Sequence, residues 1–168
     1  MTASRPDFVD VTIHGPRTRM RGVQAANVEP RPWFADFPVS RTLNQYHLVH
    51  VGIQEAQAPT KIVRTKQSTT YFLACIAGRG RVLIDGHWRI CGENYACLLP
   101  AHTLNAFEAI PKVRWEFCWV CYQRPTEQRP IANVTTPVMA RYNPLPLRSA
   151  ILGLLYECDG PAQPALMQ

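Results

Sequence analysis

The sequence predicts an all-β protein, an antiparallel barrel or sandwich with an irregular N-terminal arm and a C-terminal α-helix. Short apolar segments follow one another between residues 46 and 122, separated by turn residues and without a helical pattern between them. Within this region Asp85-Gly86 is the strongest hairpin signal, because both central positions of a type I′ turn need a positive φ. A helical stripe of apolar residues appears only after the last of these segments.

The expected strands are rich in β-branched and aromatic residues, and they span residues 46–53, 60–66, 71–77, 81–84, 87–92, 95–99 and 115–122. Segment 71–77 is apolar on both faces, so we expect protein to cover it on both sides. Gly78-Arg79-Gly80 is predicted to bend the chain and return it as the next strand. Alternate residues of the last strand share one face, and these are Trp115, Phe117, Trp119 and Cys121.

The chain divides into three expected parts, an N-terminal arm (residues 1–45), a barrel (46–123), and a connector with a helix and a possible role in dimerisation (124–168). The arm is rich in proline, and its aromatic residues Trp33, Phe34 and Phe37 are expected to anchor it. Apolar residues of the last part recur at helical spacing, namely Leu147, Ile151, Leu154, Leu155 and Cys158. This stripe can pack on the barrel or on a second subunit.

The charge of the chain does not by itself predict DNA binding. The net charge is +6, but the basic residues are scattered singly and form no dense run or helical stripe. No run of about 18 apolar residues is present, and the first residues lack the apolar stretch of a secretory signal. We therefore expect a cytoplasmic protein without a membrane span.

The cysteines are expected to be small buried side chains and not disulfide or zinc partners. Four of the six lie within apolar strand-like segments, and a cytoplasmic protein keeps its thiols reduced. Cys118 and Cys121 are three residues apart on a predicted strand, so they face opposite sides and suit no shared zinc ion.

Several features of the barrel segment occur in the order and spacing of a known family. They are Ile76-Ala-Gly-Arg-Gly80, the Ile84-Asp-Gly86 hairpin, Gly92-Glu93, Leu99-Pro100 with its loop, and the strand Trp115–Tyr122. Together they resemble the cupin superfamily and, within it, the N-terminal effector-binding domain of AraC-type transcription regulators. The resemblance covers residues 46–123 and, more loosely, the region to 158. Gly92 and Pro100 lie slightly further apart than in the common pattern.

The resemblance implies a cupin-like double-stranded β-helix, or jelly-roll barrel, that senses a small-molecule effector and forms a homodimer. In such regulators a C-terminal pair of helix-turn-helix motifs binds DNA. Only eleven residues follow Glu157, too few for these motifs, so we expect DNA contact only through a domain missing from this sequence. A stand-alone cupin enzyme (isomerase or dioxygenase) and a structural dimerisation barrel without a ligand are the alternatives.

The resemblance also locates the positions that hold metal in other cupins. They fall on Arg64, Lys66, Tyr71 and Asn105, of which the first three are poor ligands for a divalent metal. His102 is the one candidate ligand nearby. We therefore expect no metal, no cofactor and no catalytic residue.

The remaining histidines do not change this expectation. His47 and His50 are three apart on a predicted strand, so we expect them to face opposite ways. His14 and His87 lie in segments that we expect to be exposed. No spacing in the chain predicts a nucleophile paired with a base.

If Arg64 and Lys66 point into the barrel, each cation needs a partner there. Glu93, Glu108 or Glu116 could supply it, or a small anionic effector such as a carboxylate held by arginine. Alternatively, both cations face solvent on an edge strand. Aromatic residues can line a pocket or fill a core. The candidate ligand-binding residues are Arg64, Lys66, Tyr71, Leu73, Trp88, His102, Asn105, Trp115, Phe117 and Trp119.

Overall fold

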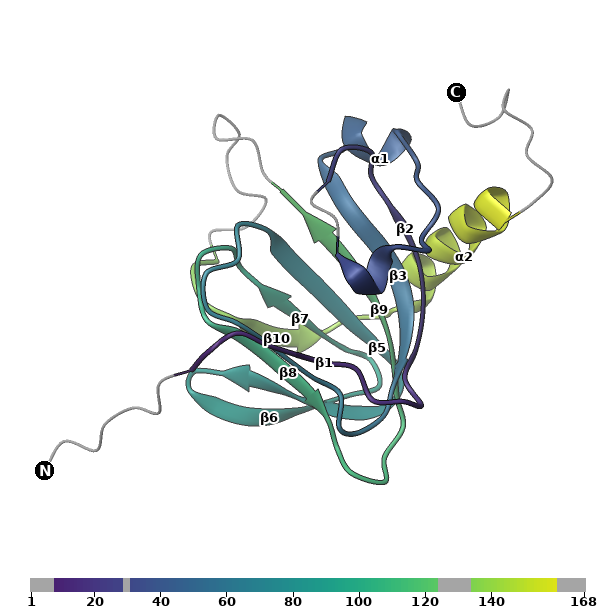
Figure 1. Cartoon of the computed structure of the whole chain (residues 1–168). Helices are drawn as coiled ribbons and strands as arrows, with labels where there is room; N and C mark the ends of the chain where they lie inside the picture. Colours follow the sequence, from purple (N-terminus) through teal and green to yellow (C-terminus); the bar gives the residue numbers. More distant parts are fainter. Residues whose placement is uncertain (1–7, 29–30, 124–133, 160–168) are drawn as a thin grey trace, which may run out of the picture.

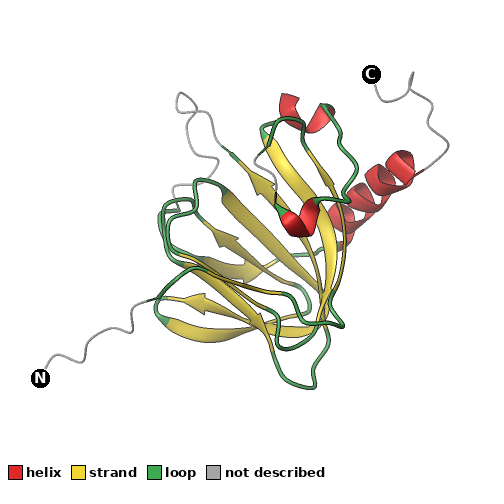
Figure 2. Cartoon of the chain, in the orientation of Figure 1, coloured by secondary structure: helices red, strands yellow, loops and turns green. Residues whose placement is uncertain are grey.

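The computed structural model describes residues 8–28, 31–123 and 134–159 of the chain (Figure 1). The strands in this part are β1 (Val11–Ile13), β2 (Arg19–Gln24), β3 (Leu48–Ala56), β4 (Lys61–Arg64), β5 (Thr70–Ile84), β6 (His87–Gly92), β7 (Tyr95–Leu99), β8 (Asn105–Ala109), β9 (Trp115–Tyr122) and β10 (Val138–Arg141). The helical elements are the 3-10 helix η1 (Pro32–Phe34), α1 (Thr42–Gln45) and α2 (Leu145–Asp159). Strands dominate, as Figure 2 shows, which confirms the predicted all-β class with a C-terminal helix.

Two sheets curl around a common interior and share the long strand β5. The first half of β5 lies in a sheet of order β2-β3-β9-β5-β7-β10, and its second half lies in a sheet of order β1-β4-β8-β5-β6. All pairings between these strands are antiparallel. The predicted antiparallel barrel is therefore confirmed, and β5 is the element that joins its two sides.

The glycines of β5 bend the strand without ending it, which corrects the predicted return of the chain there. β5 is continuous over 15 residues. Gly78 has a φ of 69°, and the register against β9 shifts between Cys75 and Ala77, as at a β-bulge. A Cβ on Gly80 would lie 2.0 Å from the ring of Trp115. The two glycines thus let β5 pass from one sheet to the other around a large interior side chain.

The predicted hairpin forms at Asp85-Gly86. Ile84 pairs with His87, and the φ values of 51° at Asp85 and 76° at Gly86 are those that such a turn requires. Two further strands, β8 and β10, are not predicted by the sequence pattern. β8 has no β-branched residue, and β10 is mostly exposed, so neither carries the usual strand signal.

The strands separate two apolar cores. One lies inside the barrel and includes Leu73, Cys75, Val82, Leu99, Phe107, Trp115, Phe117, Trp119 and Cys121. The other lies outside, where α2 covers residues of β2, β3, β5 and β9, and includes Val23, Val51, Ala74, Cys118, Ile151 and Leu155. Segment 71–77 is thus covered on both sides, and Cys118 and Cys121 face opposite sides, as predicted.

The predicted helical stripe of α2 packs on the barrel of its own chain. Ile151 and Leu155 are 3% and 2% exposed within the outer core, and Leu147, Leu154 and Cys158 pack against them. Burial of each large apolar side chain stabilises the fold by roughly 1.5–3 kcal/mol. No helix among the described residues is long and apolar enough to cross a membrane.

The N-terminal arm is largely irregular, but its described part contributes a strand to each sheet. β1 pairs with β4, and β2 pairs with β3. Phe34 and Phe37 pack against the core inside the barrel, which confirms their role as anchors. A Cβ on Gly22 would lie 2.4 Å from the ring of Phe37, so the arm folds back closely over β2.

Candidate ligand-binding cavity

A cavity of about 500 Å³ lies between the arm and the inner face of the barrel. Its arm side includes His14, Met20, Gln24, Arg31, Trp33 and Phe34. Its barrel side includes His50, Gln54, Ile62, Arg64, Lys66, Tyr71, Leu99, Asn105, Phe107, Trp119 and Cys121. Polar and apolar groups contribute about equally to this lining, and a cavity of a few hundred Å³ is of the size typical of small-molecule sites.

Hydrogen bonds within the arm hold η1 over the cavity. The Nε2 of Gln24 donates to the carbonyl oxygens of Phe34 and Phe37, both at 3.0 Å. The ring of Phe34 then lies 4.4 Å from the ring of His50, between centroids. Gln24 therefore fixes η1 as one wall of the cavity.

Arg64 ties the first strand of the arm to the barrel. It lies on β4, between β1 and β8, so it is not on an edge strand. Its guanidinium donates to the carbonyl oxygens of Val11 (2.8 Å) and Val63 (2.9 Å), and to the hydroxyl of Thr12 (2.7 Å). Burial, and then the charge of Arg31, lower the pKa of Arg64 from its usual value. Arg64 is still a cation at neutral pH, because arginine starts from so high a pKa.

The aromatic ring of Trp33 lies beside the guanidinium groups of Arg31 on the arm and Arg64 on the barrel. The Cζ atoms of Arg31 and Arg64 are 5.7 and 5.8 Å from its ring centroid. The negative face of an aromatic ring attracts such cations. The arm and the barrel thus bring two positive charges to the same region of the cavity wall.

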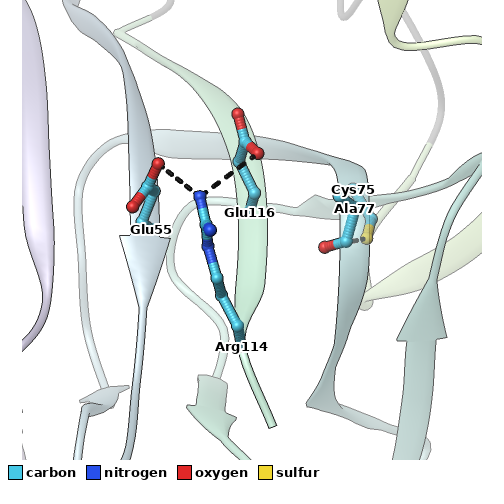
Figure 3. Close-up of polar contacts among 5 residues, drawn as sticks. All are labelled: Glu55, Cys75, Ala77, Arg114 and Glu116. Atoms are coloured by element: carbon cyan, nitrogen blue, oxygen red, sulfur yellow. Dashed lines mark hydrogen bonds and ion pairs between the residues drawn. The ribbon is translucent and has the colours of Figure 1, made fainter.

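No described carboxylate forms an ion pair with Arg64. Glu108 pairs instead with Arg81 (2.8 Å) and Lys61 (3.5 Å). Glu116 lies near Arg114, which pairs with Glu55 at 2.6 Å, as Figure 3 shows. Asp10, at the rim of the cavity, accepts two hydrogen bonds from Thr65, and these lower its pKa. Backbone and hydroxyl oxygens are therefore the partners of Arg64.

His50 presents a neutral hydrogen-bond donor to the cavity. Its Nδ1 accepts a hydrogen bond of 2.7 Å from the indole Nε1 of Trp119. Burial, and then the charge of Arg31, lower the pKa of His50 to about 3. The ring is therefore neutral at physiological pH, and its one proton is on Nε2, because Nδ1 is an acceptor.

Tyr71 and Asn105 line the cavity on the barrel side. The Tyr71 ring stacks on Phe107, with centroids 5.5 Å apart, and burial raises the pKa of its phenol well above the usual value. The Nδ2 of Asn105 donates to the carbonyl oxygen of Pro100, and its Oδ1 accepts from the hydroxyl of Thr103. Tyr71 therefore stays a neutral phenol, and Asn105 fixes the loop at the start of β8.

Five of the ten predicted ligand-binding residues meet at this cavity, namely Arg64, Lys66, Tyr71, Asn105 and Trp119. Leu73, Trp115 and Phe117 lie in the core that fills the rest of the barrel. Trp88 packs on the outside against Val63 and Leu83, with Lys61 5.5 Å from its ring centroid. His102 is exposed in its loop, where its backbone N–H donates to Gln67. The ligand-binding role of each residue stays a prediction.

Sequence reasoning missed His50, Gln54 and the arm residues of the cavity. His14, expected to be exposed, is half-buried, and both of its ring nitrogens are buried. A usable signal was present in β3, where His50 and Gln54 alternate with Val51 and Ile53. Two polar residues on the inner face of a barrel strand indicate a polar cavity, because interior positions are otherwise apolar.

The described part of the chain has no group of three or more His, Cys, Asp or Glu side chains that could hold a metal ion. Among the described residues, the cavity wall instead offers three cations (Arg31, Arg64 and Lys66) against one carboxylate (Asp10), together with neutral donors and aromatic rings. Such groups suit an organic molecule that carries negative charge or hydrogen-bond acceptors.

No protein-family model and no curated protein matches the chain. It is similar to the cupin domain of an XRE-family transcriptional regulator from Enterobacter cloacae, with 13% identity, a TM-score of 0.45, and 64% of this chain and 98% of that chain covered. It is similar to a predicted oxalate decarboxylase from Thermotoga maritima, with 10% identity, a TM-score of 0.49, and 74% and 100% covered. It is similar to the Cnp3 cupin domain of Schizosaccharomyces pombe, with 9% identity, a TM-score of 0.44, and 71% of each covered. At this level the similarity concerns the fold and assigns no activity.

Proposed function

We propose that this chain is the small-molecule-sensing and dimerisation domain of an AraC-type transcription regulator. The observation that carries the proposal is the partly open cavity of about 500 Å³ that the arm and the barrel line together. A ligand there contacts both parts at once, which a sensor needs. In this proposal DNA is bound by a helix-turn-helix domain that is not part of this sequence, and the protein acts in the cytoplasm as a homodimer.

The proposed effector is a small organic acid. Arg64 has made three of its possible hydrogen bonds within the protein, and a guanidinium has five N–H groups. Lys66 adds a third cation, at the exposed rim, to Arg31 and Arg64, and His50 adds a neutral N–H donor. A carboxylate beside Arg64 would gain a charge-assisted hydrogen bond, the strong class of such bonds.

The ligand would signal through the arm. Arg64 holds the Val11 carbonyl and the Thr12 hydroxyl, while Trp33 and Phe34 of the arm line the same cavity. A ligand in contact with these groups binds more tightly to the protein with the arm docked on the barrel than to the protein with the arm undocked. Such a difference is what shifts a population between two states.

A thermal-shift screen of the purified chain against a library of organic acids and neutral metabolites tests this proposal. A ligand at 100 times its Kd stabilises the folded protein by about 2.7 kcal/mol, so a true effector raises the melting temperature. We expect a carboxylate to raise it in the wild type and to do so less in Arg64→Ala. If no compound in a broad library shifts the melting temperature, the sensor function is refuted.

Two further measurements separate this proposal from the other functions. A transition metal bound stoichiometrically in the purified protein would support a stand-alone cupin enzyme. Sedimentation equilibrium tests the proposed homodimer, and a monomer at all concentrations would remove dimerisation from the proposal.

A further inference from the structure

One side-chain amide in the cavity wall has an Nε2 atom without a hydrogen-bond partner among the described residues. Gln54, on β3, is only 3% exposed, yet it lines the cavity between the arm and the barrel. Its Nε2 is buried and forms no hydrogen bond with any described residue. Buried side-chain amides are normally hydrogen-bonded, because an unpaired polar group in the interior is unfavourable. The Nε2 of Gln54 therefore needs a partner that the described residues do not supply.

The residues across from Gln54 cannot supply this partner. They are Met20 on β2 and Phe117 on β9, and neither offers a strong hydrogen-bonding group. Two other amides of the same wall are satisfied within the protein, since Gln24 donates to two carbonyl oxygens and Asn105 bonds to Pro100 and Thr103. A molecule in the cavity can supply the partner that these residues do not.

His14 of the arm repeats this observation on the other side of the cavity. Both of its ring nitrogens are buried and unpaired within the described part of the chain. Burial, and then the charge of Arg64, lower its pKa, so the ring is neutral and offers one donor and one acceptor. The arm and the barrel each contribute a neutral polar group to the cavity, in addition to the cations.

Aromatic rings supply much of the apolar lining of the same cavity. The arm contributes Trp33 and Phe34, and the barrel contributes Tyr71, Phe107 and Trp119. Flat rings stack well against such walls. The exposed side chain of Lys66 marks the rim, whereas Gln54 is deeply buried. The cavity thus has a rim where, among the described residues, Arg31, Arg64 and Lys66 outnumber the single carboxylate of Asp10, an aromatic lining, and a neutral polar group that is more deeply buried.

Building on the proposed sensor function, we infer that the ligand is an aromatic carboxylic acid with a hydroxyl group at the far end of its ring, and that Gln54 binds this hydroxyl. The carboxylate lies with the cations at the rim, and the ring lies between the aromatic walls. A hydroxyl accepts from an amide N–H or donates to an amide C=O, so it satisfies Gln54 in either orientation of the amide.

The test is calorimetric titration with matched pairs of acids that differ only in the hydroxyl. The pairs are 4-hydroxybenzoate with benzoate, and 3-(4-hydroxyphenyl)propanoate with 3-phenylpropanoate. For one pair we expect the wild type to bind the hydroxylated acid about tenfold more tightly, because the unhydroxylated acid leaves Gln54 unpaired. Gln54→Met should bind both acids of that pair equally. Gln57→Met, the same change three residues away and outside the cavity lining, should keep the tenfold preference.

A second measurement does not depend on the fold of a variant. In the wild type, the side-chain amide resonances of Gln54 should shift more on addition of the hydroxylated acid than of its partner. Equal affinities within both pairs, or a preference that survives Gln54→Met, would overturn the inference and leave the sensor function standing. If neither pair binds, the inference is overturned, and the broader library screen decides the sensor function separately.

Discussion

Gly52 on β3 lies directly under the indole ring of Trp119, and its replacement by alanine tests how the cavity wall is built. An added Cβ would lie 2.3 Å from Cη2 of Trp119 and 2.4 Å from the backbone oxygen of Arg21. Carbon atoms in ordinary contact are at least 3.4 Å apart, so the ring would have to retreat by about 1 Å, and the backbone of β2 at Arg21 would also have to move away. Trp119 is only 1% exposed, and its neighbours Phe37 and His50 leave little room for this movement.

The expected cost follows from two effects. Overpacking a well-filled core costs about 1–3 kcal/mol, and loss of the Trp119–His50 hydrogen bond costs about 1 kcal/mol more. We therefore expect Gly52→Ala to lower the free energy of unfolding by about 3 kcal/mol. For a protein of this size that is a fall of about 6–12 °C in melting temperature.

Thermal unfolding followed by circular dichroism measures this fall, with Gly153→Ala as the matched control. Gly153 lies in α2, and no atom is within 4 Å of the position of its Cβ. Alanine there should raise stability by about 0.5–1 kcal/mol, because glycine is a poor helix former. A melting temperature of Gly52→Ala at or above that of the wild type would refute the packing of Trp119 on β3.

Three further predictions concern the arm, the pH dependence and the thiols. Arg64→Met removes the hydrogen bonds to Val11 and Thr12, so the amide hydrogens of β1 should exchange with solvent about tenfold faster. An unchanged exchange rate would show that Arg64 does not hold the arm. The pKa of His50 is about 3 in the folded protein and near 6.5 in the unfolded chain, so the free energy of unfolding should fall as the pH drops from 6.5 towards 3. Urea unfolding across this range should show that the free energy of unfolding depends less steeply on pH in His50→Asn than in the wild type. An identical pH dependence in both proteins would contradict the neutral state of His50. Burial raises the pKa of Cys75 to about 12 and the pKa values of Cys118 and Cys121 to about 11. These thiols should therefore react with a disulfide reagent at pH 8 only after the protein is denatured. Rapid reaction of the native protein would show that they are accessible.

The strands with the clearest pattern could be predicted from the sequence. The alternation in β9, the Asp85-Gly86 turn and the helical stripe of α2 are local signals, and each has a local physical cause. β8 and β10 could not be predicted this way, because they are short and their stability comes from pairing with distant strands. Gly78 and Gly80 form a bend within β5 where the sequence predicts a turn, since a bulge and a turn need the same freedom at glycine.

The candidate site was only partly accessible from the sequence. The strand pattern of the barrel predicts that three lining residues point to the interior, namely Arg64, Tyr71 and Trp119. The cavity also depends on where the arm folds back, and that is decided by tertiary contacts of Phe34 and Phe37 that no local pattern encodes. Trp115 and Phe117 share the inner face with Trp119 but fill the core, because the barrel is packed there and hollow near the arm.

The most direct test of the central claim is a crystal structure of the protein with the tightest-binding organic acid from the screen. We predict the acid in the cavity between the arm and the barrel, with its carboxylate on Arg64 and its ring between Phe34 and Tyr71. An acid bound elsewhere on the protein, or a metal ion held in this cavity by several protein side chains, would contradict the claim.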